Sequence, residues 1–282
     1  MSKTFAFVLL SIYQLLPAVA LAGQLQLPDQ QTTAIEVYFP QKEIEVTTPQ
    51  NMTMMGGGAI GGAVAGLVSA AIDRHLEPAL NNLGKAITIE SLKEPVLEVV
   101  KAKVDPAQFP SIRAVAFHES SLEDHVKTGA SLPDEQVLVL TFRYYFTQNM
   151  GALRVSLNAT VDARKLLVAP TKKRPPMFTR QMFYDVPAKG LGFLISPREG
   201  AEYWTGVGAG TTRQMVVAGV DELLAMLSQE LTREPTFGRI AGKQLSWNSG
   251  MPGGAYGVAI DEVGDRLWIR LRNGSLASIP KR

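Results

Sequence analysis

The chain contains no cysteine among its 282 residues. This absence excludes disulfide bonds, thiolate metal sites, a cysteine nucleophile and a lipid attached to a cysteine. Net charge is also nearly absent, because 28 basic residues stand against 26 acidic ones, and only three histidines are present. A balance this close to neutral does not favour nucleic acid or a strongly acidic substrate as a partner.

The first 22 residues have the pattern of a cleavable export signal. Lys3 supplies the positive start, residues 5–16 are almost wholly apolar, and Ala20 and Ala22 are the small residues that a signal peptidase requires. The apolar run is too short to span a bilayer comfortably. We therefore expect cleavage near Ala22 and a mature chain that is periplasmic or outer-membrane-associated. The lack of cysteine suits a bacterial periplasm better than a eukaryotic secretory route, where disulfides are commoner.

Residues 54–72 (MMGGGAIGGAVAGLVSAAI) form an uncharged segment rich in glycine. Gly58, Gly62, Gly66 and Ala70 recur every four residues, so that on a helix they would share one face. Such a smooth face lets another backbone approach closely. Because each glycine costs about 1 kcal/mol in a water-exposed helix, a helix of this composition requires a packing partner.

This segment resembles the glycine-zipper segments of bacterial envelope proteins, including outer-membrane-associated lipoproteins and small two-helix membrane modules. The resemblance covers about 20 of the 282 residues, and the chain differs from the lipoproteins in lacking a cysteine for the lipid. It implies contact with a membrane or self-association through the smooth face. The alternative is a glycine-rich turn that leads into a helix buried by the protein's own fold.

Most of the remaining chain alternates between apolar and polar residues, which predicts strands. Residues 153–162 alternate without exception and predict one covered apolar face and one wet polar face, as is typical of an antiparallel sheet. The expected strands are 34–39, 112–117, 137–146, 153–162, 180–186, 256–261, 266–271 and 275–279. The clearest helix begins at Thr211 or Thr212 and carries one apolar stripe from Val216 to Leu231.

These elements predict an α+β fold in which an antiparallel sheet is packed with helices and a small C-terminal β-hairpin module follows. In chain order, the expected parts are a signal peptide (1–22), an extended lead-in with one strand (23–53), the glycine-zipper helix and a following helix (54–104), an α+β domain (105–235) and the C-terminal β-module (236–282).

No arrangement of residues in the sequence identifies a reaction. His118 and His125 lie seven apart beside acidic residues, whereas a zinc protease motif needs two histidines four apart on a helix. We predict a solvated loop there, with a loop zinc site as the alternative. The glycines from Gly206 to Gly210 lack the spacing of a dinucleotide fingerprint, which favours a flexible helix entry over an anion site. We predict no catalytic residue, metal or cofactor.

A further candidate surface lies in the last predicted hairpin. Trp268, Arg266 and Arg270 share one face of the strand at 266–271, and leucine and isoleucine side chains occupy the other. An exposed indole between guanidinium groups suits a partner surface. The alternative is an outer sheet face covered by arginine stems.

The export signal and the glycine rows together predict a non-enzymatic cell-envelope protein. It would act by contact with an envelope protein or a membrane surface, or by self-association, and no nucleic-acid partner is expected. The alternative is a periplasmic hydrolase or small-ligand-binding protein with a site on loops of the sheet.

Overall fold

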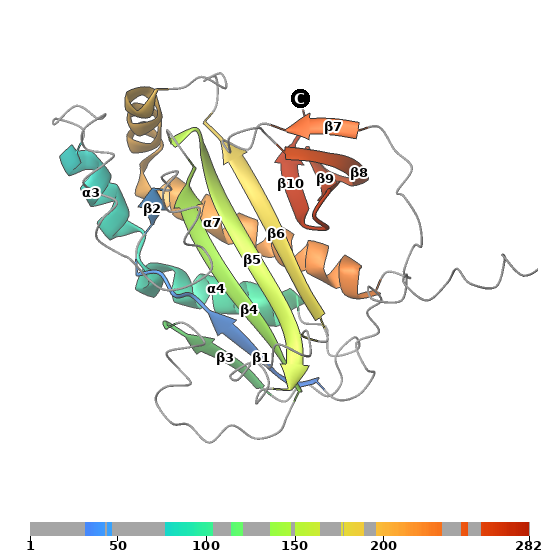
Figure 1. Cartoon of the computed structure of the whole chain (residues 1–282). Coiled ribbons are helices and arrows are strands. Elements are labelled where there is room, and N and C mark those ends of the chain that lie inside the picture. Colours follow the sequence, from blue (N-terminus) through green and yellow to red (C-terminus); the bar gives the residue numbers. More distant parts are fainter. Residues whose placement is uncertain are drawn as a thin grey trace, which may run out of the picture.

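The computed structural model describes residues 32–42, 44–46, 77–103, 114–120, 136–147, 150–163, 176, 178–188, 196–232, 244–247 and 255–281. Within these ranges, ten strands form one sheet, and three helices accompany it (Figure 1). The α+β class predicted from the sequence is confirmed. The predicted export signal and the glycine-rich segment at 54–72 lie outside the described residues.

The strands are β1 (Thr32–Tyr38), β2 (Glu45–Val46), β3 (Ala114–His118), β4 (Gln136–Phe146), β5 (Ala152–Ala163), β6 (Phe178–Pro187), β7 (Gln244–Trp247), β8 (Ala255–Val263), β9 (Arg266–Leu271) and β10 (Leu276–Pro280). The helices are α3 (Glu77–Ala86), α4 (Ile89–Lys103) and α7 (Pro197–Thr232).

The sheet is mixed, so the prediction of an antiparallel sheet was wrong in this respect. The strand order is β3-β1-β4-β5-β6-β10-β9-β8-β7, and β2 pairs with β4. β1 runs parallel to both β3 and β4, and β10 runs parallel to β6. β3 runs parallel to β1 because the chain forms α3 and α4 between these strands and then returns in the same direction, as helical crossovers do. Helix α7 lies between β6 and β10 in the same way.

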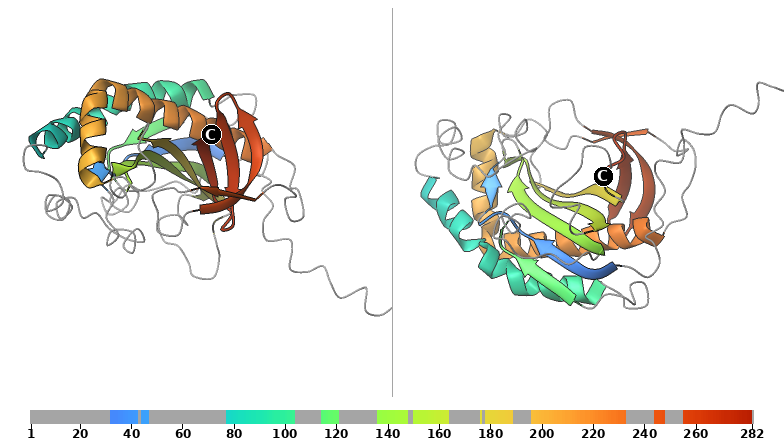
Figure 2. Two further views of the ribbon diagram at one scale, coloured as in Figure 1. Left: turned by 90° about the horizontal axis from the view of Figure 1, so that it is seen from above. Right: turned by 60° about the horizontal axis from the view of Figure 1, so that its bottom comes forward.

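The C-terminal strands β8, β9 and β10 form an antiparallel meander. The predicted hairpin at Asn273 and Gly274 is present between β9 and β10, with Gly274 at a φ of 83°. The meander continues the main sheet, because β10 pairs with β6 from Leu276↔Met182 to Ser278↔Tyr184. The meander stands at a steep angle to the central strands (Figure 2).

The helices cover one face of the sheet, and the main hydrophobic core lies between them (Figure 2). The alternating apolar residues from Leu153 to Val161 of β5 belong to this core and are 0% exposed: Leu153, Val155, Leu157, Ala159 and Val161. The covered face predicted for this strand is therefore confirmed. No helix within the described ranges has the length and apolar character needed to cross a membrane.

Helix α7 packs its backbone directly on the sheet at Gly219. A Cβ at this position would lie 2.7 Å from Tyr184 Cδ1 and 2.7 Å from Val155 Cγ2, closer than such atoms approach. Glycine is therefore required for this depth of packing. The predicted apolar stripe around it is confirmed, because Val216 and Val220 are fully buried, as are most of its other members.

The predicted start at Thr211 or Thr212 lies within four residues of a break in α7 at Gly208, after which the second of two helical segments begins, whereas the first segment, which starts at Pro197, was not predicted. Ser196 and Glu199 cap the start reciprocally: the Ser196 N–H donates to Glu199 Oε2 (2.8 Å), and the Glu199 N–H donates to Ser196 Oγ (3.2 Å). The Ser196 N–H and hydroxyl both donate to Glu199 Oε2, and these two bonds hold the pKa of Glu199 below its ordinary value. Trp204 fixes the first part of the helix, since its Nε1 donates to the Met150 carbonyl at 2.7 Å.

The helix is broken at Gly208, which divides it into a first segment before this residue and a second segment after it. Gly208 has φ 77° and ψ 161°, a region of backbone conformation that is essentially restricted to glycine. The Thr212 hydroxyl donates to the Gly208 carbonyl at 2.9 Å, directly after the break. The glycine therefore sets the angle between the two segments.

We predict that Gly208→Ala lowers the free energy of unfolding by about 1–3 kcal/mol, because alanine disfavours this conformation. Gly206→Ala and Gly210→Ala are matched controls, since a Cβ at either position meets open space and both residues lie within the helix. Each control should be neutral or stabilising by up to about 1 kcal/mol. Urea denaturation of the three variants measures the difference. Equal effects at all three positions would show that the break imposes no constraint.

Candidate functional site

The residues of the predicted partner surface lie between β9 and α7. Trp268 is 5% exposed, so the expected open indole is not present. The second segment of α7 lies against this face, since Glu222 of α7 accepts a hydrogen bond from the Trp268 indole. Figure 1 shows α7 passing behind the central strands toward the C-terminal strands. The predicted sharing of one strand face by Trp268, Arg266 and Arg270 is confirmed, since all three bond to groups on the helix side of β9.

Glu222 of α7 joins two of the C-terminal strands. Its Oε1 accepts a hydrogen bond from Trp268 Nε1 on β9 and a second, of 2.9 Å, from the hydroxyl of Ser278 on β10. One carboxylate thus provides the hydrogen-bond partner of two donors, which α7 would otherwise bury without a partner.

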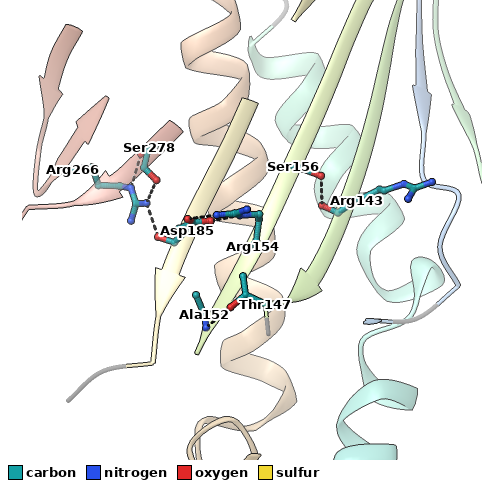
Figure 3. Close-up of polar contacts among 8 residues, drawn as sticks. All are labelled: Arg143, Thr147, Ala152, Arg154, Ser156, Asp185, Arg266 and Ser278. Atoms are coloured by element: carbon teal, nitrogen blue, oxygen red, sulfur yellow. Dashed lines mark hydrogen bonds and ion pairs between the residues drawn. The ribbon is translucent and has the colours of Figure 1, made fainter. Parts of the chain in front are cut away.

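Arg266 lies beside this carboxylate and bridges β9, β10 and β6. Its Nε donates to Ser278 Oγ at 2.7 Å, and its Nη2 donates to the carbonyl oxygens of Ser278 (2.7 Å) and Asp185 (2.8 Å) (Figure 3). The guanidinium also lies 3.9 Å from the centre of the Tyr184 ring. Burial raises the pKa of the Tyr184 phenol, although the positive charge of Arg266 opposes this shift.

A second set of contacts lies further along α7. Glu230 accepts hydrogen bonds from Arg180 Nε of β6 (3.2 Å) and from Arg270 of β9. The neighbouring Gln229 donates from Nε2 to Asp261 Oδ2 of β8 at 2.7 Å. We refer to these contacts as the polar seam; its members are Arg180, Glu222, Gln229, Glu230, Asp261, Arg266, Trp268, Arg270 and Ser278.

The geometry of the polar seam suits attachment of a helix to strands. Glu222 accepts bonds from donors on β9 and β10, Glu230 accepts bonds from donors on β6 and β9, and the Glu230 side chain is only 8% exposed. Charge-assisted bonds of this kind fix direction as well as distance. The seam therefore determines how the C-terminal meander lies on α7.

A buried ion pair occupies the opposite face of the sheet. Arg154 of β5 donates from Nε to Asp185 Oδ1 (2.6 Å) and from Nη2 to Asp185 Oδ2 (2.7 Å), and the side chains are 3% and 1% exposed (Figure 3). Burial disfavours the charged guanidinium, but the Asp185 carboxylate outweighs burial and holds the pKa of Arg154 above its ordinary value. Burial also raises the pKa of the nearby Tyr145.

This pair corrects the prediction for the polar face of β5. Arg154 is 2% exposed and Asp162 is 4% exposed, so this face is not wet along its whole length. Alternation assigns a side chain to a face, but it does not show whether other parts of the chain cover that face. Register supplies the missing information, since Asp185 stands directly opposite Arg154 in the β5–β6 pair.

The remaining candidates from the sequence are not brought together. His118 ends β3, where its ring stacks on Tyr38 with the centroids 4.5 Å apart. Within the described ranges, no three histidine or acidic side chains form a group that could hold a metal ion. The glycines from Gly206 to Gly210 span the break at Gly208, which directly precedes the second segment of α7. Positions Gly58, Gly62, Gly66, Ala70, His75 and His125 lie outside the described residues.

Comparison with known proteins gives little further information. No family model matches the chain, and no curated protein matches it. One solved structure, titled the crystal structure of an uncharacterized protein, is similar to 74% of this chain and 97% of its own, with 10% sequence identity and a TM-score of 0.26. A score of that size gives no basis for transferring a fold or a function.

We predict that Arg154→Met destabilises the protein by about 3–5 kcal/mol, because it leaves the Asp185 carboxylate buried without its counter-charge. The double variant Arg154→Met with Asp185→Leu should recover most of this loss, since neither charge is then buried. Glu262→Gln is the control: Glu262 is 67% exposed in its pair with Lys281, and its loss should change stability by less than about 0.5 kcal/mol. Urea denaturation provides the comparison. A double variant no more stable than Arg154→Met would contradict this explanation.

Proposed function

We propose that this protein is an exported component of the bacterial cell envelope that acts by association and not by catalysis. The glycine rows of residues 54–72 provide the contact, with a membrane surface, with another envelope protein or with a second copy of the chain. The observation that carries the proposal is the sequence pattern: the segment is uncharged, and Gly58, Gly62 and Gly66 recur every four residues, the spacing that would place them on one face of a helix.

The attachment of this segment to the folded body supports the proposal. In the sequence, the segment lies between β2 and α3. The residues just before β2 and those just after α3 contact each other or the same residue of β4. The Ile89 N–H donates to the Lys42 carbonyl at 3.2 Å. Gln41 accepts a hydrogen bond of 2.8 Å from the Tyr144 N–H, and the Tyr144 hydroxyl lies 3.5 Å from the Ile87 carbonyl.

These contacts hold Gln41, Lys42, Ile87 and Ile89 close to one part of β4. The chain therefore leaves the folded domain before the glycine-rich segment and returns to it after the segment at the same end. Figure 1 shows β2 and α3 on the same side of the molecule. A segment attached in this way can engage another surface without separating the strands that build the core. This arrangement suits a segment that binds another surface while the folded domain keeps its structure.

Gly62→Leu tests the proposal, because leucine would fill the smooth face and prevent close backbone contact. We expect the wild-type full chain to sediment with membranes or to elute as an oligomer, and the variant to shift to the soluble, monomeric fraction. Val64→Leu is the matched control, since position 64 lies about 200° from position 62 on a helix.

The control should behave as the wild type does. Flotation on vesicles and light scattering after gel filtration separate membrane contact from self-association. A wild-type chain that is soluble and monomeric, or a distribution that Gly62→Leu leaves unchanged, would overturn the proposal.

A further inference from the structure

We draw no further inference here: the strongest candidate, the cluster in which the guanidinium groups of Arg180 on β6 and Arg270 on β9 converge on Glu230 of α7, belongs to the polar seam already described, where both arginines serve to attach the helix to the strands.

Discussion

The close approach of helix α7 to the central sheet is the contact on which the rest of the structure depends. At Gly219 the helix backbone lies against Val155 and Tyr184, where any side chain would collide. This approach brings Val216 and Val220 into the core between the helix and β5. A helix held further out would leave the apolar face of β5 open to water, at a cost of about 25 cal/mol for each Å² exposed. The lack of a side chain at Gly219 thus allows α7 to cover the sheet.

The same helix holds the C-terminal strands by a different kind of interaction. Against β4 to β6 it buries apolar side chains, whose attraction has no preferred direction. Against β8 to β10 it presents Glu222, Gln229 and Glu230, whose bonds fix both distance and angle. Because β10 meets β6 over only three register pairs, the polar seam sets the orientation of the meander.

Local periodicity was sufficient to predict most strands, because alternation depends only on the strand's own residues. It gave the bounds of β9 correctly and those of β5 to within one residue. Pairing direction was not predictable, since it depends on crossovers such as that through α3 and α4. The burial of Arg154 and Trp268 depends on distant partners, Asp185 and α7. The first segment of α7 was missed because its glycines disfavour a helix, whereas capping by Ser196 and packing by Trp204 stabilise it.

Native-state hydrogen exchange tests most directly whether α7 and the central sheet hold each other in place. The amides of β5 and those of the second segment of α7 should exchange with the same opening free energy, equal to that of global unfolding, because neither keeps its core when the other is lost. Amides of β5 that stay protected while this segment of α7 exchanges through a smaller, separate opening would contradict the central role of this contact.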